Sequence, residues 1–538
     1  MKAITGVIAL SLAINLFATA QNQSDKVDIK WGKEIEASRR KTLSDILGHD
    51  ESGFYALQTE RKGLFGGSRE ITIDHYDQNA NQLKSVELKL EAGKEDRLYE
   101  NIIHVNGNMY LFTSYQNQKT KLNSLYVQTI DKSALKSNDD VKKLIDIDYS
   151  DYRKRNSGNF RFATSRDKSK ILVFYNLPFQ KGEKEKFGYC VYDNSMNLLW
   201  KKDITLPYND ELFDIERLRV DNEGNVYILN TVYKEKRRKK RNGEPNYQYV
   251  ILSYKNGADV ADEYPVNLPG KFLTDMQFTI SKNQDIVCAG FYSEVGTFSI
   301  KGSYFISIDS KTKEIKSQSH KEFSIDVLFE NLTERQQKKL EKKIEKGKEV
   351  ELYEYDLDDI ILRDDGGAML VGEQYFMNSV TTYQTVYNGT TATTTTVTTY
   401  YYNYNDIIVV NIDPQGQIDW VTKIPKRQVT TNDGGFYSSY TMSVVNGNLY
   451  FLFNDNPENL LEKTNDSKKY KNFSGQKGSI VVLVEVKNDG TYTKEALFKM
   501  VDAEVMIRPK VCELISKNEM VIFGQRRKTE RFAKLTFK

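Results

Sequence analysis

Residues 217–233 read RLRVDNEGNVYILNTVY, and this stretch decides the fold. Leu218 and Val220 alternate with polar residues on one side of a polar segment, and an apolar run begins at Val226 on the other. The segment between them, DNEGN, is rich in Asp, Asn and Gly, which tolerate a left-handed backbone. The pattern predicts a strand, a tight turn and a second strand. The same pattern recurs about eight times along the chain.

Each recurrence opens a longer unit of four predicted strands. The first two strands form the tight hairpin, the third often ends in Asp, and the fourth is more polar. The units begin near residues 43, 99, 160, 217, 275, 356, 440 and 508. One four-stranded unit cannot bury both faces of its sheet, whereas units stacked in a ring can. The spacing and the four-strand composition resemble those of the β-propeller superfamily, and the resemblance covers nearly the whole chain after residue 20. It implies a fold only, because the chain lacks the WD, kelch and Asp-box motifs that would imply a function.

The eighth unit lacks one strand, and the N-terminus has one to spare. Residues 26–35, KVDIKWGKEI, resemble the predicted fourth strands NLLWKKDITL and GQIDWVTKI, since each has a Trp followed within three residues by Lys. We therefore predict an all-β propeller of about eight blades, in which the N-terminal strand completes the last blade. A seven-bladed ring and two separate domains are the alternatives.

The first twenty residues predict an export signal. Lys2 precedes an apolar run over residues 4–17, and residues 18–20 read Ala-Thr-Ala, an A-x-A cleavage site. We expect a mature chain from Gln21 that forms a single propeller domain over residues 21–538, without a lipid anchor, because no Cys follows the site. No later run is long enough to cross a membrane. The expected location is periplasmic or extracellular, with the periplasm favoured and envelope association possible.

The overall charge gives no support for nucleic acid as a partner. Lys and Arg number 77 against 74 Asp and Glu, so no global field favours nucleic acid. The expected partner is a protein or a glycan. The cysteines, Cys190, Cys288 and Cys512, all lie in strand-like runs and are expected to be small buried hydrophobes.

Four long insertions interrupt the repeats, at residues 234–246, 330–350, 376–405 and 454–478. With strands lettered a to d from the axis outward, b–c loops and d–a links lie on one face of a propeller. All four insertions fall in such connections. Long loops on a rigid scaffold usually carry function, so this face is the predicted binding face.

The first insertion holds the strongest local charge of the chain. It contains Lys236, Arg237, Arg238, Lys239, Lys240 and Arg241. This run predicts an anion site for an acidic glycan, a lipid headgroup or an acidic partner, and the alternative is a solvated hairpin tip. The second insertion, around residues 332–348, predicts a charged helix with Leu340 and Ile344 on one side.

The third insertion is rich in Thr and Tyr. Asn388-Gly389 predicts a two-residue turn, and β-branched and aromatic residues flank it, so we expect a projecting hairpin. A low-complexity loop is the alternative. Its tyrosines offer amphipathic surfaces for a partner or a sugar, and the candidates are Tyr383, Tyr387, Tyr400, Tyr401, Tyr402 and Tyr404.

Evidence for catalysis is weak. Asp356, Asp358 and Asp359 lie on a predicted inner strand and could flank the channel as an acid and base or around a cation, although paired charges are the simpler explanation. The four histidines show no metal-binding spacing, and we expect no metal and no cofactor. The predicted function is an exported, non-enzymatic binding or scaffold protein. A glycan-acting enzyme with a carboxylate site at the channel mouth and a cell-surface adhesive module are the alternatives.

Overall fold

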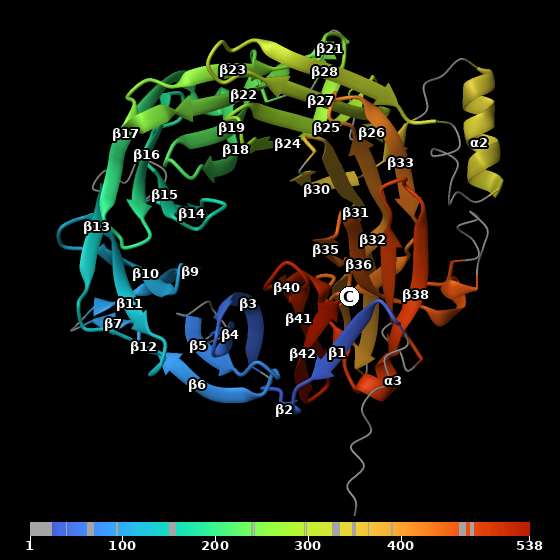
Figure 1. The fold of residues 1–538 in the computed structure, drawn as a ribbon, viewed down its shortest axis with the longest axis horizontal. Coiled ribbons are helices and arrows are strands. Elements are labelled where there is room, and N and C mark those ends of the chain that lie inside the picture. Colours follow the sequence, from blue (N-terminus) through green and yellow to red (C-terminus); the bar gives the residue numbers. More distant parts are fainter. Residues whose placement is uncertain are drawn as a thin grey trace, which may run out of the picture.

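The chain forms a closed ring of eight β-sheets in a computed structural model (Figure 1). The structure describes residues 24–38, 40–61, 69–92, 95–149, 158–237, 240–241, 243–294, 296, 299–324, 334–346, 351–353, 355–363, 365–388, 391–461, 470–473 and 478–538. The ring is an all-β propeller of eight blades, as predicted.

The first four blades are antiparallel meanders whose first strand lies nearest the axis (Figure 1). Blade 1 contains β3 (Lys41–Asp50), β4 (Gly53–Arg61), β5 (Arg69–Tyr76) and β6 (Gln82–Leu88). Blade 2 contains β9 (Leu98–Val105), β10 (Asn108–Asn117), β11 (Leu122–Asp131) and β13 (Lys142–Asp148). Blade 3 contains β14 (Phe160–Thr164), β15 (Lys170–Asn176), β16 (Lys184–Asp193) and β17 (Leu198–Asn209). Blade 4 contains β18 (Phe213–Val220), β19 (Val226–Tyr233), β22 (Tyr247–Tyr254) and β23 (Asp262–Val266).

The second half of the ring repeats this order. Blade 5 contains β24 (Phe272–Ile280), β25 (Ile286–Ser293), β27 (Gly302–Ile308) and β28 (Ile315–Glu322). Blade 6 contains β30 (Tyr355–Leu362), β31 (Ala368–Asn388), β32 (Thr391–Ile412) and β33 (Ile418–Ile424). Blade 7 contains β35 (Thr441–Val445), β36 (Asn448–Asp455), β37 (Ile480–Val486) and β38 (Tyr492–Lys499). Blade 8 contains β39 (Met506–Ile507), β40 (Glu513–Leu514), β41 (Glu519–Arg526), β42 (Thr529–Phe537) and β1 (Val27–Trp31).

Short elements fill the connections between these strands. The helices are α2 (Glu334–Glu345) and α3 (Met500–Ala503), with 3-10 turns η1 (Asp210–Leu212), η2 (Lys255–Gly257), η3 (Pro457–Leu460) and η4 (Pro509–Val511). The short strands are β2 (Ile35–Glu36), β7 (Glu91–Ala92), β8 (Glu95–Asp96), β12 (Lys136–Ser137), β20 (Lys240–Arg241), β21 (Glu244–Pro245), β26 (Ser299–Ile300), β29 (Leu352–Tyr353) and β34 (Gln428–Thr431).

The ring closes through the N-terminal strand, as predicted. Strand β1 pairs antiparallel with β42, from Val27 opposite Phe537 to Trp31 opposite Ala533. The backbone N–H of Lys538 donates to the carbonyl of Lys26 at 2.9 Å. The last blade therefore holds both ends of the described chain.

The core lies between the blades. Eight separate clusters of buried apolar side chains each join two neighbouring blades, including one in which Phe54 of blade 1 packs with Phe523 and Phe532 of blade 8. Each sheet thus buries its faces only against its neighbours, which is the reason the repeat has to form a ring.

The segment 221–225 forms a turn, and its Asp is used within the turn. Asp221 Oδ1 accepts the backbone N–H groups of Glu223 and Asn225, both at 2.9 Å, and Gly224 has a positive φ of 92°. Asp77, Asp193 and Asp413 accept the same two N–H groups in the c–d turns of blades 1, 3 and 6. The Asp in this motif therefore replaces a backbone acceptor in a five-residue turn.

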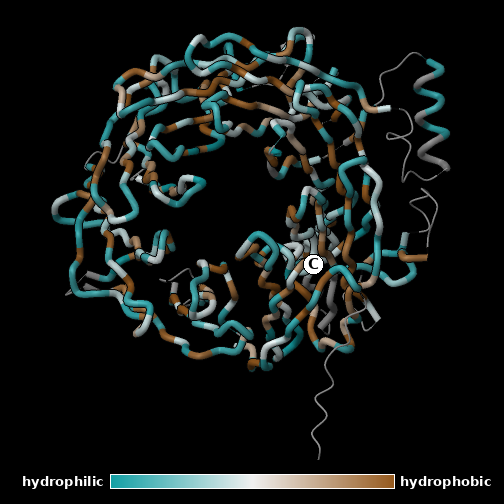
Figure 2. The backbone as a smooth tube through the Cα atoms, viewed as in Figure 1, coloured by the Kyte–Doolittle hydropathy of each residue, from teal (hydrophilic) through white to brown (hydrophobic). Residues whose placement is uncertain are grey.

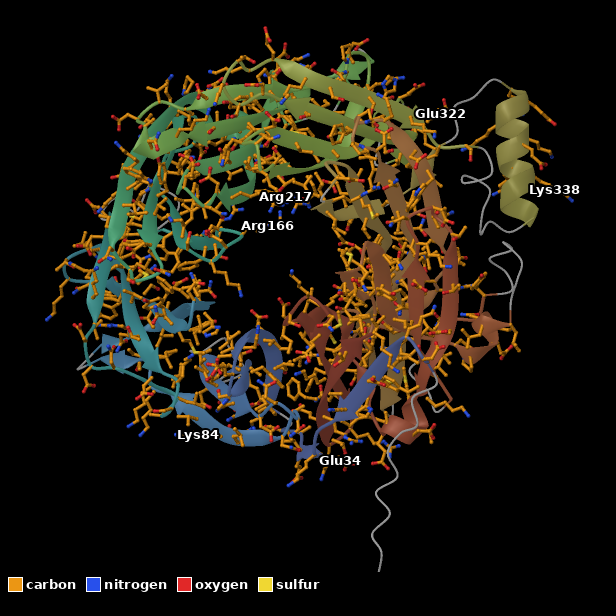
Figure 3. All side chains as sticks on the ribbon, in the orientation of Figure 1. Glu34, Lys84, Arg166, Arg217, Glu322 and Lys338 are labelled. Carbon is orange, nitrogen blue, oxygen red and sulfur yellow. The ribbon has the colours of Figure 1, made fainter. Side chains whose placement is uncertain are left out.

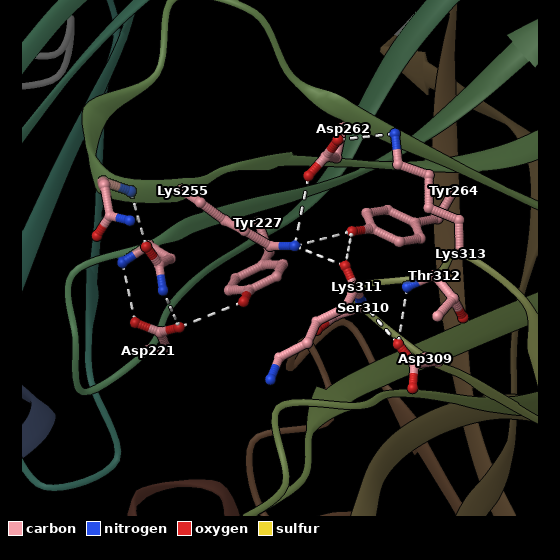
Figure 4. Close-up of polar contacts among 12 residues, drawn as sticks. Asp221, Tyr227, Lys255, Asp262, Tyr264, Asp309, Ser310, Lys311, Thr312 and Lys313 are labelled. Carbon is pink, nitrogen blue, oxygen red and sulfur yellow. Dashed lines mark hydrogen bonds and ion pairs between the residues drawn. The ribbon is translucent and has the colours of Figure 1, made fainter.

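Neighbouring turns are also fastened to one another (Figure 4). Lys255 Nζ donates to the carbonyl of Ser310 at 2.6 Å, and the Tyr264 hydroxyl donates to the same carbonyl at 2.7 Å. Asp262 pairs with Lys255 at 3.4 Å and with Lys313 at 2.7 Å. These contacts join blades 4 and 5 at the face of the ring that carries the short turns.

The remaining fold predictions concern single elements. All three cysteines are free and buried, which confirms their expected role as core residues. Helix α2 stands outside the ring and is mostly hydrophilic (Figures 1 and 2). Thr333, its predicted N-terminal cap, lies outside the described residues, as do the side chains of Leu340 and Ile344. Within the described part of the chain, no helix combines the length and the apolar character that a membrane crossing requires.

Candidate functional site

The ring has two unlike faces. The a–b and c–d turns lie on one, which we call the turn face, and the b–c and d–a connections lie on the other, which we call the insertion face. The insertion face carries the basic hairpin after β19, the link containing α2, the extension of β31 and β32, and the segment after β36. The antiparallel meander causes this sorting, because every second connection leaves from the same end of the sheet.

The Thr/Tyr insertion is a long two-stranded ribbon. Strands β31 and β32 stay paired from Ala368 opposite Ile412 to Asn388 opposite Thr391. Tyr383 is 75% exposed, and Tyr400 is exposed as well. Tyr401 and Tyr402 are half-buried, because β34 pairs with β32 at that level. The side chain of Tyr387 lies outside the described residues.

Tyr404 does not belong to the exposed surface, and its prediction as a contact residue is wrong. It is 7% exposed and packs against Tyr375, with the two tilted rings 4.6 Å apart. Its hydroxyl accepts a hydrogen bond from Lys510 Nζ at 2.6 Å. Since β34 crosses the base of the ribbon and Lys510 approaches from blade 8, this tyrosine anchors the ribbon to the ring.

Of the basic run 236–241 in the first insertion, the structure describes the side chains of Lys236 and Arg237. Arg237 forms an ion pair with Asp214 at 2.7 Å and donates to the carbonyls of Asp210, Glu211 and Phe213. These contacts hold the preceding link in place, while the Arg237 side chain stays 49% exposed, and an anion-binding role for it remains a prediction. Lys236 is exposed. Arg238 and Lys239 lie outside the described residues, as do the side chains of Lys240 and Arg241 in the short hairpin β20–β21.

A cavity of about 770 Å³ opens on the insertion face between blades 3 and 4. Its walls come from the ends of β14, β15 and β16, from η1 with the start of β18, and from the start of the basic insertion. The lining includes Arg161, Phe179, Glu185, Asp210, Phe213, Asp214 and Arg237. Of the lining residues, only Lys236 and Arg237 belong to the predicted site.

Glu185 is the unusual residue of this cavity. It is only 8% exposed, and its carboxylate has no hydrogen bond or ion pair with any described residue. Burial, with a smaller contribution from the nearby Asp210 carboxylate, raises its pKa to about 7, while Arg237 acts in the opposite direction. The pairing register of β16 with β17 shifts between Lys184 and Lys186, so Glu185 lies in a bulge. Bulges commonly re-aim a side chain.

The inner-strand carboxylates lie near the axis on the insertion face. Asp356 and Asp358 are exposed and Leu357 between them is buried, so the two carboxylates share one side of β30. Asp358 accepts the Tyr440 hydroxyl, and desolvation together with Glu373 and Asp356 raises its pKa to about 6. The side chain of Asp359 lies outside the described residues. Nowhere among the described residues do three His, Cys, Asp or Glu side chains come together in a group able to hold a metal ion.

A second large cavity, of about 720 Å³, lies at the turn face between the inner ends of blades 3 to 6. Arg166 lines it, and Arg166 and Arg217 both lie at the inner edge of the ring in Figure 3. Its walls also include the turn residues Asn222, whose Oδ1 accepts the backbone N–H of Asp167 in the neighbouring turn, and Ser281, whose hydroxyl accepts the backbone N–H of Asp285.

Three of the four histidines gather at the turn face, which their sequence spacing did not indicate. His49 and His75 belong to blade 1 and His104 to blade 2. Tyr55 stacks on His75 at 4.6 Å and lies 5.9 Å from His104. Burial lowers the pKa of His104 to about 4, with Lys132 adding to the effect. This cluster is a packed, neutral group rather than a set of ligands.

Comparison with known proteins gives a fold and no family. No protein-family model matches the chain, and no curated protein matches it. The β-propeller domain of the Trilobed protease from Pyrococcus furiosus is similar over 72% of this chain and 98% of that one, with 11% identity and a TM-score of 0.31. The Dos1 propeller is similar over 94% of each chain, with 8% identity and a TM-score of 0.29. The GH43 endo-arabinanase from Bacillus licheniformis is similar over 55% of this chain and 98% of that one, with 11% identity and a TM-score of 0.21. The likeness is one of fold alone.

Proposed function

We propose that the chain is an exported, non-enzymatic binding protein, and that a partner protein docks on the ribbon formed by β31 and β32. The observation that carries the proposal is the exposure of this ribbon. Five of its large apolar side chains are exposed, namely Met377, Val380, Tyr383, Val397 and Tyr400. Exposed apolar side chains gathered on one element in this way are typical of an interaction site.

The register sorts these side chains onto the two faces of the ribbon. Residues directly opposite each other project to the same side, and Ser379 lies opposite Tyr400. Met377, Tyr383 and Tyr400 therefore share one face, and the hydroxyls of Thr381 and Thr398 lie 3.1 Å apart on that face. Val380 and Val397 occupy the other face. A partner can thus contact a flat surface built from tyrosine, threonine and methionine.

The edges of the ribbon are open as well. Among the described residues, β31 has no second partner strand beyond Gln374, and β34 covers β32 only at residues 401–404. Soluble proteins usually protect such edges with charged residues or proline. No charged residue and no proline occurs from Gln374 to Asn405, although 28% of the whole chain is charged. An extended segment of a partner can add to an edge of this kind through backbone hydrogen bonds.

Site-specific photo-crosslinking tests this proposal. p-Benzoylphenylalanine is placed at Tyr383 in the chain expressed in a bacterial host that exports it, and at Val260 as the control. Val260 is 82% exposed and lies in the c–d turn of blade 4, on the opposite face. We expect a discrete adduct with another protein from position 383 and none from position 260. Adducts from both positions, or from neither, would contradict the proposal, and an adduct of twice the chain mass would identify a second copy instead.

Export has its own test. We expect cell fractionation to recover the chain outside the cytoplasm with Gln21 at its N-terminus. Replacing Leu10 and Leu12 by Asp interrupts the apolar run and should keep the precursor inside the cell. Recovery of the unprocessed wild-type chain in the cytoplasm would rule out this part of the proposal.

A further inference from the structure

The cavity between blades 3 and 4 combines two properties that the partner-binding ribbon does not explain. It is large enough for a small organic ligand, at about 770 Å³. It also holds a buried carboxylate, Glu185, that has no described partner. Glu is almost never this deeply buried without a partner, so its place in the cavity wall calls for a reason.

The charges at the depth of this cavity favour a cation. Asp210 and Asp214 lie close enough to Glu185 for their carboxylates to raise its pKa. Arg237 is committed to Asp214 and to three backbone carbonyls. Arg161 donates to the carbonyls of Ile215 and Glu216 at 3.4 and 3.2 Å. Arg237 thus has most of its N–H donors occupied, and Lys181, also in the lining, pairs with Glu211 at 3.0 Å. The carboxylates of Glu185 and Asp210, by contrast, form no ion pair with a described residue.

The walls suit a hydrocarbon chain that carries the cation. Phe179 and Phe213 line the cavity beside the carboxylates. An alkylammonium group supplies three N–H donors, which a buried carboxylate and nearby acceptors can accept. A metal ion is a poorer fit, because no group of three potential ligands occurs in the described part of the chain.

We propose that this cavity binds a small organic molecule bearing a primary ammonium group, and that Glu185 is the residue that pairs with it. The irregular pairing of β16 with β17 at this point leaves Glu185 outside the regular ladder, and η1 supplies another part of the cavity wall. The Asp210 side chain fixes that wall by accepting the backbone N–H of Gly182 at 2.9 Å. The site is built from blades 3 and 4 and their connections, and it is separate from the ribbon of blade 6.

Titration calorimetry with 1,4-diaminobutane tests the site on the intact chain at pH 8, with 1,4-butanediol as the uncharged ligand of the same carbon skeleton. We expect one diamine per chain with a dissociation constant of about 1 mM or lower, and no comparable heat with the diol. Glu185→Gln should weaken diamine binding about 10-fold or more, because a hydrogen bond between two charged groups is lost. Glu34→Gln, a change at an exposed carboxylate on the rim of blade 8, should leave it unchanged (Figure 3).

A second variant keeps the test decisive if Glu185→Gln is misfolded by circular dichroism. Phe179→Ala removes part of the apolar wall and should weaken binding several-fold without touching a charge. Equal affinity of the wild type and Glu185→Gln, equal binding of diol and diamine, or no diamine binding at all would overturn the proposal. If crosslinking finds no protein partner for the ribbon, the calorimetry still tests the cavity, since the two sites share no residue.

Discussion

At the scale of single residues, the protein buries charge in two different ways. Lys426 has a fully buried side chain, and its Nζ lies 2.5 Å from Glu373 Oε1, while Ser439 and Gln428 complete the group. Glu185 is almost as deeply buried but has no hydrogen-bond or ion-pair partner among the described residues. The first arrangement is a closed network that holds blades 6 and 7 together. The second leaves a carboxylate without a partner. Substitution should therefore lower the stability of the protein at Lys426 and raise it at Glu185.

Glu185→Gln should stabilise the protein at high pH. The pKa of Glu185 rises from an ordinary 4.5 to about 7 in the folded chain, because burial disfavours the charged form. Below about pH 4.5 the group is neutral in both states, and between there and about pH 7 the wild type loses stability as the unfolded chain ionises first. The variant lacks this loss. We expect it to exceed the wild type by roughly 1–2 kcal/mol at pH 8, after allowance for residual solvation, and to match it near pH 4.5.

Urea unfolding at both pH values measures the difference. The same gain at pH 4.5 as at pH 8 would show that shape, rather than ionisation, decides the effect.

Lys426→Met should destabilise the protein by about 3–5 kcal/mol, because it leaves Glu373 charged and buried without its partner. The double variant Lys426→Met, Glu373→Gln should recover much of this loss, since no buried charge then remains. Thermal or urea unfolding of the two variants gives the comparison. A double variant that is as unstable as the single one would mean that packing, not charge, dominates at this position.

At the scale of elements, the ribbon of β31 and β32 divides into an anchored base and a free end. Tyr404, which packs against Tyr375 and accepts a hydrogen bond from Lys510, marks the base. Asn432 binds the backbone of Tyr400 in both directions, with its N–H donating to the carbonyl and its Oδ1 accepting the N–H. Beyond Tyr400 the strands contact mainly each other. The base therefore belongs to the ring, and the end is available for binding.

Replacing residues 380–399 with Asn-Gly should leave stability within about 1 kcal/mol of the wild type, because the new turn is closed by the existing pair of Ser379 and Tyr400. The same variant should abolish the crosslinked partner, with the probe moved to Met377. Deleting residues 377–405 should instead cost several kcal/mol, because it removes buried Tyr404 and the strand that pairs with β34.

Unfolding curves of the two chains provide the check. Equal destabilisation by both changes would show that the free end also supports the ring.

At the scale of the whole molecule, eight inter-blade clusters and one terminal strand hold the ring closed. Strand β1 completes blade 8, and Val27 lies within the cluster shared by blades 7 and 8. The ends of the described chain meet there, with the Lys538 N–H 2.9 Å from the carbonyl of Lys26. The closure depends on strand pairing and packing rather than on where the chain begins. The termini should therefore tolerate being moved to another exposed loop.

A circular permutant that joins Lys538 to Ser24 through a short Gly-Ser linker, and opens between Gly389 and Thr390, should fold with stability within about 1–2 kcal/mol of the wild type. Deleting residues 24–31 should cost about 3 kcal/mol or more, because it exposes the edge of β42 and opens the cluster around Val27. Urea unfolding compares the two. A permutant less stable than the deletion would contradict this account of closure.

The sequence predicted what local chemistry controls. Apolar alternation and turns such as 221–225 determine the blades, and the Trp-Lys resemblance of residues 26–35 to other fourth strands revealed the closure. Sequence patterns did not predict features that depend on contacts between segments far apart in the chain. The burial of Tyr404 depends on β34 and on Lys510 of blade 8. Glu185 stands in an ordinary charged run, KEKF, and only the bulge against β17 turns it toward the cavity. The acidic run NDELFDIE, from residue 209, was the one signal that could have indicated an acidic wall.

The closure by β1 also has a kinetic consequence. The first strand of the ring pairs with the last, so blade 8 cannot form until the whole chain is available. Until then β42 has no outer neighbour and the apolar side chains between blades 7 and 8 lack Val27. Contacts between residues this far apart in sequence form slowly, because the loop entropy is lost before the contact repays it. Closure is therefore expected as the final step of folding, and a chain arrested before it should be the species that proteases and aggregation remove.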